Sequence, residues 1–402
     1  MPRQQSVAWH VAANPSMLAV RAYPSIQTMP RESIKRILPM HNGAAAGLPT
    51  SEIRSFAQKH ILLTGAGGWI GSALTQALLC ASPAHLVLLD SSERNLHEVD
   101  AVLRESPCRP GHTSILGSVT DAALLREIFE RHSPQIIFHA AACKHVPLME
   151  SNPLAALRNN ALGTHTLLEA ALESSAETFV LVSTDKAADP HSIMGASKRI
   201  AELAVLSNTH PRMQRKIARL VNVLGSPGSV VPRFQQQIAT GAPVTVTHPE
   251  AERYCMNLQE AVAMLLALVA PNVPSGLYIP TVKEPIKILD LARRMIAEHA
   301  APPAPEILFI GLRPGEKVTE TLLSTQESWA DPEAVDAPWR RVQSPCPTIE
   351  GLLLALRALA YAVEQRNLAD ALHWIHQIVP EYRAEAHPMQ EGLPALTAEL
   401  QR

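Results

Sequence analysis

The chain has 402 residues, of which 47% are hydrophobic and 18% are charged, so it can build a full core and more than one folding unit. Its formal net charge of −2 provides no long-range attraction to nucleic acid or to an anionic membrane, and we expect neither as a partner. The five cysteines are scattered without a CxxC pair, which argues against a metal site and against a disulfide framework.

Two features bear on the compartment. No apolar run approaches the roughly 18 residues that a membrane span needs, because Arg357 interrupts the stretch 352–363. The N-terminus also lacks the apolar core of a signal peptide. We therefore expect a cytoplasmic protein with reduced cysteines.

A glycine-rich turn follows the first expected strand, residues 61–64. The glycines Gly65, Gly68 and Gly71 lead directly into an amphipathic segment over residues 72–79. Glycine permits the positive φ of such a turn and lets the backbone approach a pyrophosphate, while the start of a helix offers unpaired N–H groups. The pattern also fits a strand–turn–helix corner without a ligand. The second expected strand, however, ends in Asp90, where a ribose-binding carboxylate belongs, and this favours a dinucleotide site.

The order of the elements predicts an α/β fold with a doubly wound parallel sheet and helices on both faces. We expect its strands at residues 61–64, 86–90, 114–116, 136–139, 179–183 and 217–221, and a helix over 194–207. Ligands of such sheets bind beyond the carboxyl ends of the strands. Chemistry is therefore expected at residues 117–118, 140–142 and 183–186.

From residue 227 the sequence pattern changes to shorter elements with prolines. Among them we expect a strand over 243–246, a helix over 258–269 and a turn over 311–316. We expect four regions: an N-terminal arm at 1–50 with at most short helices such as 31–38, a dinucleotide-binding domain at 51–226, a substrate lobe at 227–325 that returns to the core sheet, and a tail at 326–402. The tail is expected to be a polar linker followed by helices over 350–363 and 367–378.

Three proton-handling side chains follow the fifth expected strand: Thr184, Asp185 and Lys186. Further on, Met194 and Lys198 occupy the places of the Tyr and Lys of a short-chain dehydrogenase, in which the Tyr hydroxyl is the acid/base and the Lys, one helical turn away, lowers its pKa. A thioether cannot transfer a proton. Met194 and Lys198 also fit an ordinary helix pair, one residue in the core and one on the surface.

Seven motifs together resemble a known family: residues 65–71, 138–150, 159–164, 183–186, 194–199, 228–232 and 313–317. The stretch from about Glu52 to Tyr382 is similar to the CapD-like polysaccharide-biosynthesis group of the extended short-chain dehydrogenases/reductases. The resemblance implies a nucleotide-sugar 4,6-dehydratase, typically acting on UDP-N-acetylglucosamine. Many members carry membrane helices and a further domain before this region, so the chain resembles the soluble catalytic unit.

The resemblance also implies roles for single residues. Thr184 would hydrogen-bond the sugar hydroxyl at carbon 4, Asp185 would act as the acid, and Lys186, with a lowered pKa, as the base, while Lys198 would hold the nicotinamide ribose. Met194 replaces the tyrosine in this branch of the family too. The substrate site is expected at Lys144, His145, Asn222, Val231, Arg253, Arg313 and Glu316. The cofactor site is expected at Gly65, Gly67, Gly68, Trp69, Ile70, Gly71, Asp90, Ser91, Arg94, Ser118, Val119, Ala140, Ala141, Ala142, Lys144, Asn159, Ser183 and Lys198.

Several residues leave alternatives open. Asp90 favours NAD because a carboxylate repels a 2′-phosphate, but Arg94 is placed to accept one, so NADP stays open. Arg313 and Glu316 also fit a simple surface turn, Trp69 fits a packing role, and His139 and His145 fit structural histidines. The sequence departs from the family pattern near the expected sugar or cofactor at Cys143, Ser118, Leu220, Val221 and Arg233, which leaves room for a specialised sugar.

Two rival functions remain at this stage. A nucleotide-sugar epimerase shares the first oxidation, but the adjacent Asp185 and Lys186 favour elimination. A regulatory module that binds dinucleotide without turnover is consistent with the missing tyrosine, whereas Asp185, Lys186 and Lys198 together weigh against it. We expect a homo-oligomer.

Overall fold

The computed structural model describes residues 55–383, except residues 80, 107–109, 209, 301 and 336. The expected N-terminal arm, with its helix at 31–38, lies outside the described residues. So do the residues after 383.

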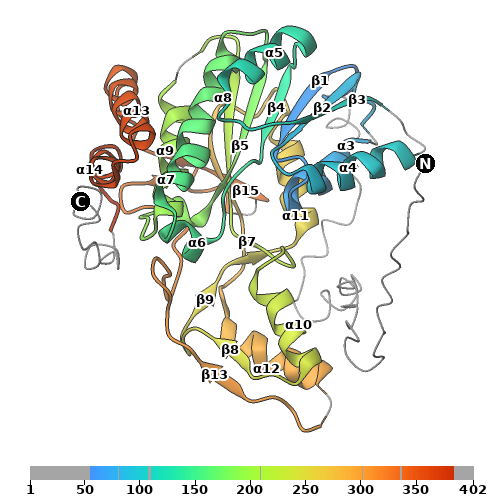
Figure 1. Cartoon of the computed structure of the whole chain (residues 1–402), viewed down its shortest axis with the longest axis vertical. Helices are drawn as coiled ribbons and strands as arrows, with labels where there is room; N and C mark the ends of the chain where they lie inside the picture. Colours follow the sequence, from blue (N-terminus) through green and yellow to red (C-terminus); the bar gives the residue numbers. More distant parts are fainter. Residues whose placement is uncertain are drawn as a thin grey trace, which may run out of the picture. The chain divides into compact units, whose positions relative to one another are not determined.

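The described residues form a nine-stranded main sheet in the order β14-β15-β11-β6-β5-β4-β1-β2-β3 (Figure 1). Strands β1 to β6 and β11 are parallel to one another. At one edge of the sheet, β15 runs antiparallel to β11, and β14 runs antiparallel to β15. The strands are β1 His60–Thr64, β2 His85–Asp90, β3 Gly111–Leu116, β4 Ile136–His139, β5 Thr178–Thr184, β6 Gln214–Leu220, β11 Gly276–Pro280, β14 Ser328–Trp329 and β15 Trp339–Gln343. The doubly wound fold and its six expected strands are confirmed.

Helices cover both faces of this sheet because its strands are apolar on both sides. In β1, Ile61 and Leu63 pack toward one face and Leu62 toward the other. The first face is covered by α3 Trp69–Leu79, α4 Glu93–Glu105 and α11 Leu258–Ala267. The second face is covered by α5 Ala122–His132, α8 Gly163–Leu172 and α9 Ile193–Ser207.

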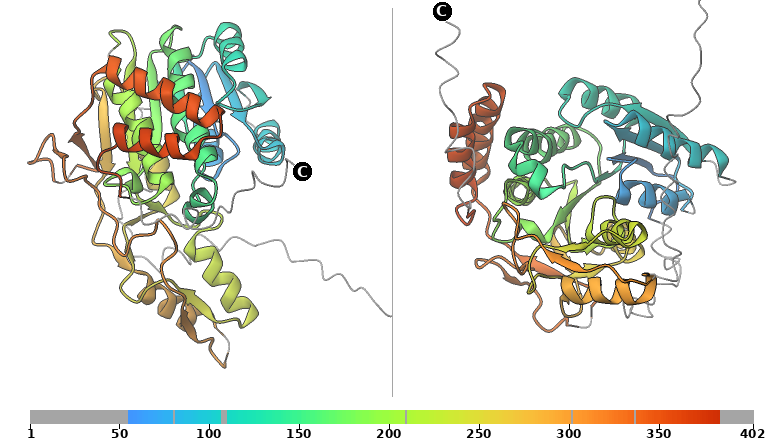
Figure 2. Two further views of the ribbon diagram at one scale, coloured as in Figure 1. Left: turned by 60° about the vertical axis from the view of Figure 1, so that its left-hand side comes forward. Right: turned by 60° about the horizontal axis from the view of Figure 1, so that its bottom comes forward.

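Two C-terminal helices form a third layer outside α9. They are α13 Ile349–Glu364 and α14 Leu368–Ile378, which lie side by side in Figure 2. Their apolar side chains, such as Leu359 and Ile375, pack in one cluster with Ile200 and Leu203 of α9. As a result α9 is buried on nearly all sides, and the charged residues that it carries lie inside the protein.

A smaller group of elements lies beside the main sheet (Figure 1). It consists of β7 Asn222–Val223, α10 Val230–Thr240, β8 Val244–Val246, β9 Glu252–Arg253, β10 Cys255–Met256, β12 Ile286–Lys287, α12 Ile288–His299 and β13 Ile307–Phe309. Three short pairings, β7 with β10, β8 with β13 and β9 with β12, hold it together. The chain returns to the main sheet through β11, β14 and β15, so the stretch expected as a linker contains two strands of that sheet.

In the part of the chain that the structure describes, no helix is long and apolar enough to cross a membrane.

Candidate functional site

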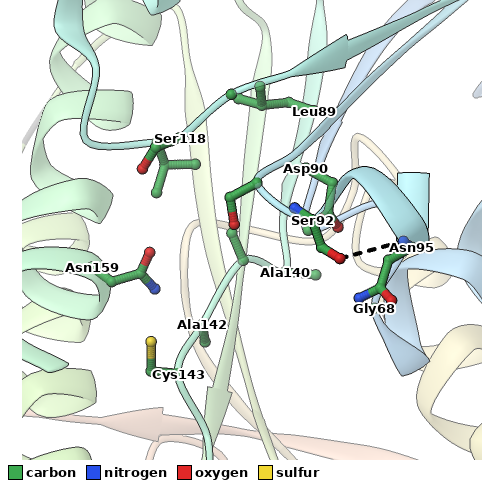
Figure 3. A pocket seen from close by; sticks show the side chains of 15 residues that line it. Gly68, Leu89, Asp90, Ser92, Asn95, Ser118, Ala140, Ala142, Cys143 and Asn159 are labelled. Atoms are coloured by element: carbon green, nitrogen blue, oxygen red, sulfur yellow. Dashed lines mark hydrogen bonds between the residues drawn. The ribbon is translucent and has the colours of Figure 1, made fainter. Parts of the chain in front are cut away.

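A pocket lies where the order of the strands reverses, between β1 and β4. In doubly wound sheets this is where ligands bind. The pocket has a volume of about 240 Å³ and is built from the segments that follow β1, β2, β3 and β4 (Figure 3). Its lining residues are Gly65, Gly68, Leu89, Asp90, Ser91, Ser92, Asn95, Gly117, Ser118, Val119, Ala140, Ala141, Ala142, Cys143 and Asn159.

Most of the residues expected at the cofactor line this pocket. Those that do not are Gly67, Trp69, Ile70, Gly71, Arg94, Lys144, Ser183 and Lys198. Five further residues line the pocket: Leu89, Ser92, Asn95, Gly117 and Cys143. Gly117 belongs to a strand end at which chemistry was expected, whereas the other four were not among the expected cofactor residues. All five are neighbours of expected cofactor residues in the sequence, and spacing alone does not reveal which side of a turn faces a ligand.

The three glycines of the turn have different tasks. Gly65 has a φ of +67°, and a Cβ there would lie 2.6 Å from the backbone nitrogen of Ala141. A Cβ on Gly71 would overlap the carbonyl oxygen of Gly65, so α3 packs directly against the turn. A Cβ on Gly68 would meet only the Gly65 oxygen, at 3.1 Å, and Gly68 lines the pocket. A side chain at Gly68 would therefore project into the pocket.

Asp90, the last residue of β2, lines the pocket. Its two carboxylate oxygens accept one hydrogen bond each, from the backbone N–H groups of Gly67 and Ser92, both at 2.9 Å. Each oxygen keeps a free lone pair, which suits the hydroxyl groups of a ribose. The side chain of Arg94 is 87% exposed and pairs with Glu98 at 3.0 Å. The residues of this pocket thus fit the adenosine ribose of NAD, which has a free 2′-hydroxyl, better than that of NADP, which carries a 2′-phosphate.

A π-helical turn supplies the opposite wall. This segment, η1 Leu157–Leu162, joins α7 Pro153–Ala156 to α8, and such turns are frequent at functional sites. Asn159 faces the pocket, whereas Asn160 accepts from the backbone N–H of Cys143 at 2.8 Å and donates to its carbonyl at 2.9 Å. Asn160 thereby fixes the loop after β4, which carries Ala140 to Cys143.

His139 is a structural residue. It is fully buried, and its two ring nitrogens lie 2.7 Å from the hydroxyl of Thr64 and 2.8 Å from that of Thr164. Burial, aided by the positive charge of Lys198, lowers the pKa of His139 to about 3. The ring is neutral at physiological pH, and it links β4 to β1 and α8.

Charged groups converge at the end of β5 and in the following turn η2 Asp185–Ala187. The hydroxyl of Thr184 donates to Asp185 Oδ1 at 2.9 Å, and Lys186 Nζ donates to the same oxygen at 3.0 Å. Lys186 Nζ also donates to Asn222 Oδ1 at 3.2 Å, and Glu320 Oε1 lies 3.7 Å from it. We call Asp185, Lys186, Asn222 and Glu320 the Lys186 cluster. The structure thus brings together three of the expected catalytic residues, Thr184, Asp185 and Lys186, and adds Glu320.

The pKa of Lys186 differs from the expectation. Burial by itself lowers this pKa, but the carboxylates of Asp185 and Glu320 outweigh burial and leave it above its usual value. The expectation of a lowered pKa was wrong. Asp185, the neighbour of Lys186 in the sequence, makes the larger contribution that raises this pKa, and Glu320, which the sequence does not reveal beside the amine, adds to it. Lys186 is therefore a cation in this structure, and it must lose a proton before it can act as a base.

Lys198 and Met194 lie on the buried helix α9. Met194 is 3% exposed. Lys198 is also 3% exposed, and its Nζ donates to the carbonyl of Val182 in β5 at 2.7 Å. Burial lowers the pKa of Lys198 to about 8, although Glu202 opposes the shift. The alternative of a core and surface pair is wrong for Lys198, because its side chain is buried and its amine is bound to β5.

A second charged group lies behind β5. Arg219 is fully buried and binds Glu202 and Glu327 through both oxygens of each carboxylate, at distances from 2.6 to 3.0 Å. Arg199 lies 3.2 Å from both carboxylates. We call Arg199, Glu202, Arg219 and Glu327 the Arg219 cluster. Ser183 donates its hydroxyl to Glu202 at 2.7 Å, so this expected cofactor residue has its side chain in the Arg219 cluster.

The expected substrate residues have varied surroundings. Arg253 donates to the carbonyls of Glu252, Val318 and Lys317 at 2.7 to 2.8 Å, which ties β9 to the segment that carries Glu320. Lys144 Nζ donates to the carbonyl of Pro227 at 3.2 Å.

The remaining expected substrate residues lie on three other segments. His145 lies against Gly228, and Val231 is buried in the first turn of α10. Arg313 and Glu316 form a turn closed by their own side chains at 2.9 Å. Their roles toward a substrate stay predictions.

The chain matches a known protein family over most of its length. Residues 61–337 match the family model of the polysaccharide biosynthesis proteins, Polysacc_synt_2. The chain belongs to this family. It is 40% identical over 306 residues to the probable polysaccharide biosynthesis protein EpsC of Bacillus subtilis, a match that covers 73% of this chain and 51% of EpsC. The chain thus spans about half the length of that relative.

More distant relatives carry names that state an activity. A UDP-N-acetylglucosamine 4,6-dehydratase (inverting) of Campylobacter jejuni is 31% identical over 68% of this chain and 80% of the relative. The structure of a UDP-glucose 4-epimerase from Thermus thermophilus in complex with NAD matches with a TM-score of 0.55 at 21% identity, covering 65% of this chain and 90% of that one. The fold is therefore that of the extended short-chain dehydrogenases/reductases, and a structural relative holds NAD.

Proposed function

We propose that the protein is an NAD-dependent nucleotide-sugar 4,6-dehydratase that converts UDP-N-acetylglucosamine to a UDP-linked 4-keto-6-deoxy sugar. One observation carries the proposal: the carboxylate of Asp185 and the amine of Lys186, 3.0 Å apart, stand side by side at the carboxyl end of β5. Elimination of water needs an acid and a base at adjacent carbons, and this pair offers both. The relative from Campylobacter jejuni, named for this reaction, supports the substrate.

The pocket between β1 and β4 would hold the cofactor. Gly65 and Gly68 would cradle the pyrophosphate and Asp90 the adenosine ribose, while Lys198 would hold the other ribose. Bound there, NAD would accept the hydride of carbon 4 and return it to carbon 6 of the same sugar. The carboxylate of Asp90 disfavours NADP.

Thr184 and Asp185 together would replace the missing tyrosine. The Thr184 hydroxyl already donates to Asp185 Oδ1, so it can pass on a proton that it receives. Oxidation at carbon 4 releases the proton of the sugar hydroxyl, which would move through Thr184 to Asp185. Asp185 would thereby become the acid that the next step requires. Met194 carries no proton in this scheme.

Elimination would follow at carbons 5 and 6. The ketone at carbon 4 acidifies the proton on carbon 5, and neutral Lys186 would take it. Asp185 would protonate the departing hydroxyl of carbon 6, so that water leaves. Lys186 would then return its proton to carbon 5 while the hydride reaches carbon 6.

The charges around this site suit an anionic substrate. The cations Lys186, Arg253 and Lys317 outnumber the anions Asp185 and Glu320 within the group of side chains linked by distances up to 3.9 Å. A diphosphate would bring the missing negative charge. This supports a nucleoside-diphosphate sugar as the substrate class.

The experiment that tests the proposal is turnover of UDP-N-acetylglucosamine labelled with deuterium at carbon 4. A product lighter by one water, with the label at carbon 6 and no free reduced cofactor, is expected. An epimerase would instead give an isomer of unchanged mass that keeps the oxygen on carbon 6. If no nucleotide sugar in a panel reacts, the catalytic proposal fails.

The cofactor assignment has its own test. Gly68→Val places a branched side chain in the cradle, and we expect it to abolish NAD binding measured by calorimetry. Gly68→Ala is the graded control: its Cβ meets only one atom, at 3.1 Å, so it should fold and bind NAD more weakly than the wild type does. Normal NAD affinity in Gly68→Val would remove the assignment.

A further inference from the structure

Glu320 is a buried carboxylate with an uncommitted oxygen. The residue is 4% exposed and follows the single bridge between Thr319 and Glu252. Its Oε2 accepts no hydrogen bond from any residue in the described part of the chain, and the cationic Nζ of Lys317 is 3.9 Å from that oxygen. A buried polar atom without a partner is rare and calls for an explanation.

The other oxygen of Glu320 faces the amine of Lys186. Lys186 Nζ is 3.7 Å from Oε1, and Arg253 Nε is 3.9 Å from it. Both distances exceed hydrogen-bond range, but a shift of less than 1 Å brings the amine and the carboxylate into contact. Glu320 and Lys186 therefore attract each other electrostatically, but no hydrogen bond joins the two side chains.

Lys186 needs a proton acceptor that Asp185 does not provide. In the proposed reaction Asp185 receives the proton of the carbon 4 hydroxyl and keeps it for the leaving group. The cationic Lys186 must give up its own proton at the same stage, when the substrate covers the site. Asn222, its remaining hydrogen-bond partner, offers an amide oxygen, which does not hold a proton at neutral pH.

We propose that Glu320 takes the proton of Lys186 before elimination and returns it at the end of each turnover. Glu320 acts through Lys186 and touches neither sugar nor cofactor in this scheme. The inference rests on the proposed dehydratase function and adds to it a residue from the segment after residue 313. The family resemblance had assigned Glu320 no role.

The protons balance over one cycle. At the start Asp185 and Glu320 are anions and Lys186 is a cation. The carbon 4 hydroxyl proton moves through Thr184 to Asp185 as the carbon 4 hydride departs, and Lys186 passes its proton to Glu320. The C5–H and C6–O bonds then break: neutral Lys186 takes the carbon 5 proton, and Asp185 protonates the leaving hydroxyl.

The second half of the cycle restores the residues. The hydride forms the new C6–H bond, Lys186 returns a proton to carbon 5, and Glu320 reprotonates Lys186. All three residues then have the charges with which they began. The sugar has lost one water, whose added proton came from the carbon 4 hydroxyl, and no external acid, base or oxidant is consumed.

Other charged and titratable groups also face Lys186. Burial raises the pKa of the Cys255 thiol to about 12, so this neighbour stays neutral. The cation Arg253 opposes the positive charge of Lys186. Among the described residues, the charged and titratable groups around Lys186 come from η2, β9, β10 and the segment after residue 313, and they are Asp185, Arg253, Cys255, Lys317 and Glu320.

The first test is Glu320→Gln, which keeps the size of the side chain and removes its ability to hold a proton. Oxidation at carbon 4 should continue, so that reduced cofactor accumulates, while product formation and deuterium exchange at carbon 5 fall about 100-fold. Because Lys186 must then lose its proton to solvent, the remaining rate should rise up to about tenfold per pH unit above neutrality. The wild type should show no such rise.

Two further variants separate this role from a structural one. Glu252→Gln makes the same chemical change on β9, where the carboxylate accepts from Thr319 at 3.0 Å, and it should keep the rate and pH profile of the wild type. Glu320→Asp keeps a carboxylate and should restore most of the pH-independent rate. A uniform loss in Glu320→Gln without a pH slope, or the same slope in Glu320→Asp, would overturn the proposal.

A second measurement does not depend on turnover. The rate at which acetic anhydride labels Lys186 is followed against pH by peptide mass spectrometry. Glu320→Gln should lower the midpoint of this curve by about one pH unit, because it removes an anion that favours the charged amine. An unchanged midpoint overturns the role of Glu320. If the wild type converts no nucleotide sugar but the midpoint shifts, the dehydratase function fails while the coupling of Glu320 to Lys186 stands.

Discussion

The Lys186 cluster and the Arg219 cluster both bury charges of opposite sign near the end of β5, but they are built differently. In the Arg219 cluster each oxygen of Glu202 and Glu327 accepts at least one hydrogen bond from Arg219. In the Lys186 cluster one oxygen of Glu320 accepts none from the described residues, and Lys186 is 3.7 Å from the other.

The difference follows from the chemistry of the two cations. Arginine stays charged in proteins and its planar fork matches a carboxylate, so it suits a permanent structural pair. Lysine changes its protonation state readily when it is buried, so it suits a site that must move a proton. We infer that the Arg219 cluster stabilises the fold. In the Lys186 cluster, Glu320 makes no hydrogen bond to Lys186, so a proton can move between them during the proposed reaction.

The largest expected effect is the loss of activity in Lys186→Met. Without the amine, product formation should fall about 1,000-fold, within the range of general acid–base contributions. NAD affinity should stay near that of the wild type. Lys198→Met is the matched variant, and it should weaken NAD binding and hydride transfer together. Equal, small effects of both substitutions on turnover would contradict the separate roles of the two lysines.

The complementary prediction concerns stability. Arg219→Met removes the arginine that binds both oxygens of each buried carboxylate and leaves them with Arg199, so it should lower the free energy of unfolding by about 3–5 kcal/mol. Urea titration followed by circular dichroism measures this change. Arg212→Met, on an exposed site just before β6, should change stability by no more than about 0.5 kcal/mol. A mild Arg219→Met variant would remove the structural role of the cluster.

The Arg219 cluster should also respond to acid. Burial alone would raise the pKa of Glu327, but Arg219 and Arg199 outweigh it and lower the pKa to about 2, from 4.5. This shift corresponds to about 3 kcal/mol of stability. Because the folded-state pKa is depressed, the contribution is complete above pH 4.5 and is lost as the pH falls toward 2.

Glu327→Gln makes this dependence measurable. The difference in unfolding free energy between the wild type and Glu327→Gln should be largest near neutral pH and should shrink from pH 4.5 toward 2. Chemical denaturation over this range measures the difference. A difference that does not change with pH would show that Glu327 contributes by packing alone.

The smallest expected effect is that of Met194→Leu. The substitution nearly conserves volume in a buried site and removes no proton-carrying group, so it should cost less than about 1.5 kcal/mol of stability and leave turnover within a few-fold. Steady-state kinetics and thermal unfolding check both parts. A collapse of activity would mean that Met194 takes part in the reaction.

Regular patterns in the sequence predicted the fold well. The apolar runs that end at Thr64, Asp90, Leu116 and His139 became β1 to β4 with the same carboxyl ends. An apolar run followed by glycine or an acidic residue is a clear local signal of where a strand ends. The strands β14 and β15 were missed because they are short and lie in a polar stretch, and pairing makes them strands: β15 pairs with β11, and β14 pairs with β15 at the edge of the sheet.

The candidate site was predictable where its residues are neighbours in the sequence. Thr184, Asp185 and Lys186 follow one strand, so their convergence needed no knowledge of the tertiary structure. Glu320 comes from a segment more than one hundred residues away and has no local signal of its own. Glu320 adds to the larger effect of Asp185 in raising the pKa of Lys186, so the pKa was predicted in the wrong direction.

By itself, the sequence determined the doubly wound sheet, the glycine turn with Asp90, and the acid and amine after β5, because each depends on residues close along the chain. The tertiary structure decided which charges become neighbours. It placed Glu320 beside Lys186, buried Lys198 with its amine against the carbonyl of Val182, and directed Ser183 toward Glu202. Electrostatic energies depend on distances in space and on burial, and neither can be read from spacing along the chain.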